Sequence, residues 1–246
     1  MEPSKVIDHI RNNKLSAQSQ RQQLDLINAM NRDHRDARAG DDQLESRIQS
    51  FEMAFRMQTE ATEAFDLSRE TTTTRSLYGP GSYADSLIIA RRLVQRGVRT
   101  VQVFTGAGQP WDDHGNIVNG HRSKAQASDR AIAALLADLK RLGLLDETLV
   151  LWGGEFGRTP TSEGADGRDH HIFGFSVWMA GGGIKGGVAH GRTDELGFHA
   201  VESRHYVTDI HATILRQMGL DSRKLEIPGR KRLEIDHGKP ITEIIA

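Results

Sequence analysis

The stretch Thr148-Leu149-Val150-Leu151-Trp152-Gly153-Gly154-Glu155-Phe156-Gly157-Arg158-Thr159-Pro160 indicates the fold class of this chain. It begins with a short apolar run and continues into a glycine-rich polar loop, a pattern typical of a buried strand and the loop after it. Residues 98–104 and 175–180 have the same apolar character. We therefore expect three strands, at 98–104, 148–152 and 175–180.

Helical patterns separate and follow these strands. Apolar residues recur at helical spacing over residues 83–95, 123–142 and 206–218, and Gly97 stands where a helix C-cap is expected. Apolar strands that alternate with helices of this length are typical of a mostly parallel sheet covered on both faces. The pattern therefore predicts an α/β fold.

Two local patterns are interpreted as structural rather than functional. Residues 181–186 (Gly-Gly-Gly-Ile-Lys-Gly) formally match a dinucleotide-binding fingerprint, but no helical pattern follows them. Because that fingerprint needs a helix N-terminus to receive the pyrophosphate, a turn at the sheet edge is the favoured interpretation. Thr208 or Asp209 is the expected N-cap of the last helix.

The part of the chain before residue 76 has a different character. It is polar, with apolar residues at helical spacing in two groups, and residues 39–42 (Ala-Gly-Asp-Asp) predict a break between them. The two groups are Leu24, Ile27 and Met30, then Leu44, Ile48, Phe51 and Phe55. We expect a helical hairpin region over 1–75, packed on a main α/β domain over 76–246.

Composition excludes several classes of function. The chain has 246 residues and a net charge of −1, so it lacks the basic excess of a nucleic-acid-binding protein. It contains no Cys, which excludes disulfides, thiolate zinc sites and iron–sulfur clusters. No apolar run approaches the roughly 18 residues that a membrane span needs, and the first residues lack the apolar core of a signal peptide.

Histidines and carboxylates are concentrated in the loops around the predicted strands. Ligands bind beyond the carboxyl ends of strands in open parallel sheets, so these loops are expected to meet in one crevice. Carboxylates with imidazoles are ligands of zinc, manganese or iron, whereas calcium takes oxygen ligands. The candidate metal ligands are Asp112, His114, Glu155, His170 and His171, with Asp169 beside them. The alternative is that these are solvated turns, with Glu155 capping the next element or pairing with Arg158.

Several motifs carry a family resemblance. The heptapeptide over residues 154–160 (Gly-Glu-Phe-Gly-Arg-Thr-Pro) is the most specific, and it is accompanied by Trp111-Asp112 with His114-Gly115-Asn116, by Asp169-His170-His171, and by the segment over 208–215. From Tyr78 onward the chain resembles domain of unknown function 1501, an uncharacterised bacterial sulfatase-like family. That family is similar to the alkaline phosphatase and sulfatase superfamily.

The superfamily resemblance implies a three-layer α/β/α sandwich, alkaline phosphatase-like, with a bimetallic site. Asp112 and His114 match the pair that holds one metal, Glu155 falls where the superfamily has an Asp-His loop, and His170 or His171 matches a late metal-binding His. In this scheme Asp169 orients a His ligand and Arg158 clamps the anion. The implied activity is hydrolysis of phosphate or sulfate esters with a divalent metal, zinc or manganese rather than calcium.

The same resemblance implies that something is missing. Members of the superfamily begin with a strand that carries a metal-binding Asp and the nucleophile, and members of the family usually begin with an export signal. By this comparison the chain is an N-terminally truncated member of an exported, periplasmic family, without its first strand. Two functions therefore stay open, a metal-dependent hydrolase or a non-catalytic protein that binds anionic ligands or acts structurally.

Overall fold

The computed structural model describes residues 14–37, 42–225 and 237–246. The chain forms two compact units, one made of Met1–Ser76 with Ile88–Gln102 and the other of Leu77–Leu87 with Val103–Ala246. The helix α4 (Ser82–Gln95) contributes to both, because the division falls between its residues 87 and 88. The expected division at residue 76 stays a prediction.

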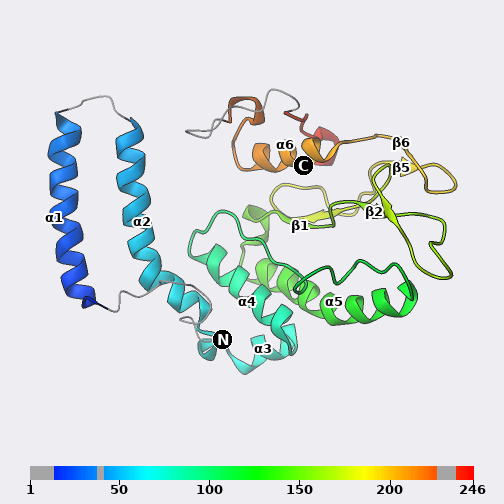
Figure 1. Ribbon diagram of the computed structural model, residues 1–246, viewed down its shortest axis with the longest axis horizontal. Helices are drawn as coiled ribbons and strands as arrows, with labels where there is room; N and C mark the ends of the chain where they lie inside the picture. Colours follow the sequence, from blue (N-terminus) through cyan, green and yellow to red (C-terminus); the bar gives the residue numbers. More distant parts are fainter. Residues whose placement is uncertain (1–13, 38–41, 226–236) are drawn as a thin grey trace. The chain divides into compact units, whose positions relative to one another are not determined.

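The first unit begins with a helical hairpin, as the apolar spacing predicted. The helices α1 (Ala17–Asp36) and α2 (Asp42–Phe65) lie side by side (Figure 1). Arg21 joins them, because its guanidinium lies 2.7 Å from the Glu52 carboxylate and 4.8 Å from the centre of the Phe55 ring. The first residues of the predicted break, 39–41, fall outside the described part of the chain.

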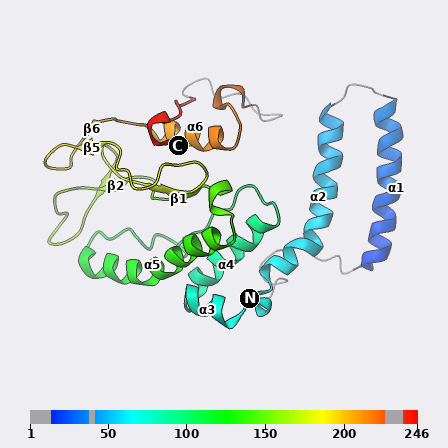
Figure 2. The same ribbon diagram turned by 180° about the vertical axis from the view of Figure 1, so that it is seen from behind.

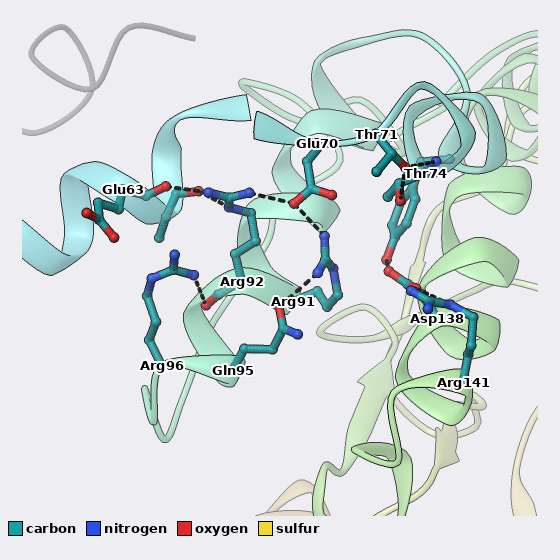
Figure 3. A network of polar contacts seen from close by, with 12 residues as sticks. Glu63, Glu70, Thr71, Thr74, Arg91, Arg92, Gln95, Arg96, Asp138 and Arg141 are labelled. Carbon is teal, nitrogen blue, oxygen red and sulfur yellow. Dashed lines mark hydrogen bonds and ion pairs between the residues drawn. The ribbon is translucent and has the colours of Figure 1, made fainter. Parts of the chain in front are cut away.

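Buried ion pairs connect α2 and the turn after it to α4 in the first unit. The short helix η2 (Leu67–Arg69) follows α2, and the next helix, α3 (Thr72–Tyr78), leads toward α4. One oxygen of Glu70, Oε1, accepts hydrogen bonds from Arg91 (2.7 Å) and Arg92 (2.6 Å), and Arg92 also donates to the carbonyl oxygen of Ala64 at 2.8 Å (Figure 3). These contacts fasten the end of α2 and the following turn to α4.

Helices form much of the second unit. Its longest helix is α5 (Ile117–Arg141), followed by the short η3 (Leu145–Glu147), and its last long helix is α6 (Val207–Gln217). The short helices η4 (Ser222–Lys224) and η5 (Thr242–Ile244) follow. In the view from behind, the strand β1 (Val150–Trp152) lies between α5 and α6 (Figure 2). Helices were predicted at 83–95, 123–142 and 206–218, and α4, α5 and α6 confirm them, with α5 starting six residues early.

The described strands of the second unit are short and pair antiparallel. β1 (Val150–Trp152) pairs with β4 (Trp178–Ala180), β2 (Gly157–Arg158) with β3 (His170–His171), and β5 (Arg192–Thr193) with β6 (Ala200–Glu202). β1 and β4 confirm two of the predicted strands in shortened form. The mostly parallel three-layer α/β/α sandwich stays a prediction.

The strand expected at residues 98–104 was wrong, because no described residue of that segment is assigned to a strand. A strand exists only when its backbone groups pair with a neighbour, and apolar character alone does not supply that neighbour. Val98 and Phe104 are both exposed, so the segment is not buried as a central strand would be.

The glycine-rich segment after β4 is a turn, as expected. Gly181, Gly182 and Gly183 all have positive φ angles, and a Cβ on Gly181 would lie 2.3 Å from the carbonyl oxygen of Leu145. Only glycine tolerates this conformation and approach without strain. No helix follows within the described residues up to β5, so the dinucleotide interpretation has no structural basis there.

The start of α6 differs from the sequence-based expectation. Tyr206 is the N-cap, and Asp209 lies three residues into the helix, where its Oδ2 accepts the backbone N–H of Tyr206 at 3.0 Å. Asp209 therefore serves the N-terminus as the return half of a capping box rather than as the cap itself. The prediction of Thr208 or Asp209 as N-cap was wrong by two or three positions.

No helix among the described residues combines the length and the apolar character that crossing a bilayer requires.

Candidate metal site

The loop before α5 carries the first candidate ligands. It turns at Asp112, whose N–H donates to the carbonyl oxygen of Gln109 at 3.1 Å, and it ends at Asn116, which has a left-handed backbone with φ of 50°. The N–H of Asn116 donates to Oδ1 of Asp166 at 2.8 Å. The loop is thus fixed at its end by a carboxylate from a segment 50 residues away.

The second side of the site is the strand pair β2–β3. Arg158 and His170 are direct cross-strand partners in this pair. The pairing continues beyond the strands, because the N–H of Thr159 donates to the carbonyl oxygen of Asp169 at 3.0 Å. Side chains at directly opposed positions project from the same face of a sheet, which brings the guanidinium and the imidazole together.

Both sides meet at one oxygen atom, Oδ1 of Asp112. The Arg158 guanidinium donates to it at 2.6 Å and Nε2 of His170 at 2.9 Å, while Nε2 of His114 lies 3.0 Å away. The two imidazole rings have centroids 5.3 Å apart. Phe156 lies against His170, with ring centroids 4.3 Å apart, and so limits the orientations open to that imidazole.

The charges of the cluster shift two pKa values in opposite directions. The hydrogen bond from Arg158, and then the one from His170, hold the pKa of the Asp112 carboxyl at about 2, below its usual 3.8. The hydrogen bond from His114 Nδ1 to Glu163, 2.5 Å long, raises the pKa of the His114 imidazole above 6.5. Asp112 therefore stays ionised at neutral pH, and protons and cations compete for His114.

The donor set of Asp112, His114 and His170 fits a divalent transition metal. One carboxylate oxygen and one nitrogen from each histidine all lie within 4.8 Å of one another. Three protein ligands with a fourth position left for water or substrate are typical of catalytic zinc. Asp112, His114 and His170 would therefore be the residues that hold such an ion.

The cluster leaves out two of the residues expected as ligands. Glu155 is exposed, and its side chain makes no hydrogen bond or ion pair with any described residue. His171 is the neighbour of His170 in β3, so its side chain points to the opposite face of the strand. It is 6% exposed, and its Nε2 donates to the carbonyl oxygen of Phe198 at 2.7 Å. The structure thus brings together Asp112, His114, His170 and Arg158 and leaves Glu155 and His171 outside.

Asp169 lies beside the cluster without touching Asp112. Its Oδ1 accepts the backbone N–H of its neighbour His170 at 2.7 Å. A second group of possible ligand atoms, all within 4.8 Å of one another, consists of Asp169, His114 and Glu163. Asp169 therefore supports the strand that carries His170. One of its carboxylate oxygens also lies within 4.8 Å of a ring nitrogen of His114.

Sequence reasoning missed Glu163. This residue lies in a tight hairpin in which Glu163 and Gly167 exchange backbone hydrogen bonds of 3.0 Å in both directions. The glycines at 164 and 167 indicated a turn, but no pattern distinguished its acidic residue from a solvated one. Only the fold brings residue 163 to the loop that carries His114.

Comparison with known proteins identifies a family without a known activity. A family model described as "Protein of unknown function (DUF1501)" matches residues 1–245. No curated protein and no solved structure matches the chain. The match spans nearly the whole sequence, including every residue of the candidate site.

Proposed function

We propose that this chain, which belongs to the DUF1501 family of proteins of unknown function, is a metal-dependent hydrolase of phosphate or sulfate esters. The observation that carries the proposal is the convergence of His114, His170 and Arg158 on one oxygen of Asp112. We also propose that the ion is zinc or manganese, because two imidazole ligands disfavour calcium. The resemblance to sulfatases and alkaline phosphatases supports this reaction class and an exported location.

The exposure of the ligands supports access for an ion and a substrate. The side chains of His114 and His170 are 42% and 44% exposed, whereas Asp112 is 18% exposed. The carboxylate is thus the more buried part of the cluster, and the imidazoles lie nearer to solvent. Solvent therefore has direct access to both imidazoles.

Arg158 supports an anionic substrate. Its guanidinium has five N–H donors, and only NH1 is engaged by Asp112 in this cluster. The planar fork suits pairs of oxygens on phosphate or sulfate. If Asp112 held a metal ion, the remaining N–H donors of Arg158 would bind the oxygens of the anion.

The residues have distinct roles in the proposed reaction. A bound divalent ion polarises an ester oxygen and lowers the pKa of a bound water. Asp112, His114 and His170 would hold the ion, Arg158 would bind and orient the anion, and Asp169 fixes the backbone of His170. The position of Arg158 next to the ligands brings the anion to the face of the cluster that is open to solvent.

Turnover of chromogenic aryl phosphates and aryl sulfates tests the proposal. The chain is stripped with a chelator and reloaded with zinc or manganese, and its rates are compared with those of His170→Ala and the control His199→Ala, a histidine outside the cluster. We expect metal-dependent turnover in the wild type and the control, and loss of it in His170→Ala. Equal rates in all three proteins, or turnover without metal, would reject a metal-dependent hydrolase at this site.

One observation favours a second candidate, a non-catalytic protein that binds anions. The Arg158 guanidinium lies 2.6 Å from Asp112 and supplies a counter-charge to its carboxylate. In this case Arg158 and the two imidazoles beside it would bind a sulfated or phosphorylated ligand directly. Binding of an anionic glycan that does not depend on metal, without turnover of any ester, would favour this second function.

A further inference from the structure

We infer that Glu163 is the positioning residue of the candidate metal site, holding His114 in the orientation and tautomer that binds the ion. The inference rests on the proposed metal site. It is carried by the geometry of the two nitrogens of one ring, since Nδ1 of His114 faces Glu163 at 2.5 Å and Nε2 faces Asp112 at 3.0 Å. The two carboxylates thus lie at opposite nitrogens of the imidazole.

This arrangement decides which nitrogen is free to bind. A carboxylate has no hydrogen to donate, so Glu163 accepts the Nδ1–H of His114. In the neutral imidazole the lone pair then lies on Nε2, the atom that faces Asp112. Histidines that bind metals commonly donate their other N–H to a carboxylate, which fixes the ring and raises its basicity as a ligand.

The backbone holds Glu163 beside His114. The hairpin that carries Glu163 is joined to the His114 loop by the hydrogen bonds from the N–H of Ile117 to the carbonyl oxygen of Asp166 (3.3 Å) and from the N–H of Arg168 to that of Asp113 (3.2 Å). A Cβ on Gly167 would lie 2.0 Å from the carbonyl oxygen of His114, so the two segments touch only because residue 167 is glycine. The contact is therefore built into the fold rather than made by two free side chains.

Zinc affinity measured by competition with a chromogenic chelator tests the inference. We compare the wild type with Glu163→Ala, Glu163→Asp and the control Glu202→Ala, which removes another exposed glutamate that pairs with an arginine. Loss of an outer carboxylate partner costs about 10- to 100-fold in metal affinity. We expect a loss in this range for Glu163→Ala, partial recovery in Glu163→Asp and no change in the control.

Nitrogen-15 spectra of the histidine rings supply a readout that a purely structural role would not move. We expect the His114 ring of the zinc-loaded wild type to be protonated at Nδ1 and bound through Nε2, and to lose this single tautomer in Glu163→Ala. The signals of His171, which is held by a backbone carbonyl, should not change. A Glu163→Ala protein that unfolds is excluded by unchanged amide spectra away from the site.

The outcomes separate this inference from the proposed function. If the wild type binds no zinc, the proposed function fails. If the wild type binds one zinc and Glu163→Ala binds it equally tightly with the same tautomer, the positioning role of Glu163 is overturned while the metal site survives. Binding of two ions, one of which is lost in Glu163→Ala, would also overturn it, because Glu163 would then be a ligand of its own ion.

Discussion

Two clusters of this protein use the same arrangement for different ends. In the first unit, Oε1 of Glu70 accepts hydrogen bonds from Arg91 and Arg92, and all three side chains are less than 10% exposed. In the second unit, Oδ1 of Asp112 is the acceptor of the cluster, with Arg158 as one of its donors. Both clusters place several cationic or polar donors on a single carboxylate oxygen.

The difference lies in the donors and in their access to water. The donors of Glu70 are both arginines, which keep their charge at any pH that a folded protein experiences. Asp112 is contacted instead by one arginine and two exposed imidazoles, and a neutral imidazole can bind a metal ion. Buried arginines around a carboxylate thus fasten the backbone. Exposed histidines around a carboxylate can instead bind a metal ion.

The largest expected effect on stability comes from the Glu70 cluster. Glu70→Gln leaves two buried guanidinium groups without their counter-charge, and breaking such a pair typically costs about 3 to 5 kcal/mol. We expect a loss of this size in the free energy of unfolding measured with urea. The exposed pair partner Glu202 provides the control, because Glu202→Gln should cost about 1 kcal/mol or less.

Zinc binding of the Glu70→Gln protein sharpens the comparison further. We expect it to match the wild type under conditions where the variant is folded, since Glu70 belongs to the other unit. A Glu70→Gln protein as stable as the wild type would show that the arginine cluster does not hold the first unit together.

The next effect concerns Arg158, which should influence metal and anion binding in opposite directions. Arg158→Gln removes a positive charge from beside the ion, and about 1 kcal/mol of repulsion between unit charges near 4 Å in water corresponds to about fivefold in affinity. We therefore expect zinc affinity to rise by at least about fivefold. A hydrogen bond to a charged group contributes about 1.5 to 3 kcal/mol, so inorganic phosphate or sulfate should bind roughly 10- to 150-fold more weakly.

Calorimetric titrations of the same Arg158→Gln sample with zinc and then with phosphate measure both effects. Arg158→Lys keeps the charge and is the control for the first of them. Weaker zinc binding in Arg158→Gln would mean that Arg158 organises Asp112 for the ion instead of competing with it.

Much of the helical structure could be predicted, because helix signals are local. The spacing of Leu24, Ile27 and Met30 reports one face of one helix and needs no distant partner. Strand pairing is not local, and the apolar residues of 148–152 and 175–180 do not state that β1 and β4 run antiparallel. The expected strand at 98–104 failed for the same reason.

For the candidate site too, the sequence indicated which residues could be ligands but not which of them the fold brings together. Asp112, His114 and His170 stood out because a carboxylate and two imidazoles are chemically distinctive in polar loops next to the predicted strands. His171 was assigned with His170 because sequence adjacency hides the alternation of side chains along a strand. Glu163 had no signal of its own, since its role depends on a hairpin that approaches His114 through Gly167.

The smallest expected effect is a change in the pKa of Asp112, measured at acid pH in the protein without metal. The pKa of Asp112 is lowered to about 2, so its contribution to stability is present above pH 3.8 and is lost as the pH falls toward 2. In Arg158→Gln the largest cause of the shift is gone, and the pKa of Asp112 should rise toward 3.8. Carboxyl carbon NMR signals followed from pH 6 to 2 measure it.

Asp221 is the internal control for this titration. Its carboxyl pKa is also lowered to about 2, in this case by Arg223, so it should titrate identically in the wild type and in Arg158→Gln. An Asp112 signal that does not move in Arg158→Gln would show that Arg158 does not hold this carboxylate in solution.

The most direct test of the central claim, that the Asp112 cluster binds a divalent transition metal, is a zinc titration of the chelator-stripped protein by calorimetry. The account predicts one zinc ion per chain in the wild type and in Asp221→Asn, which alters an arginine-bound carboxylate outside the cluster. It predicts a loss of more than about 100-fold in affinity for Asp112→Asn, beyond the range expected for an outer-sphere partner. No saturable zinc binding in the wild type, or equal binding in Asp112→Asn, would contradict it.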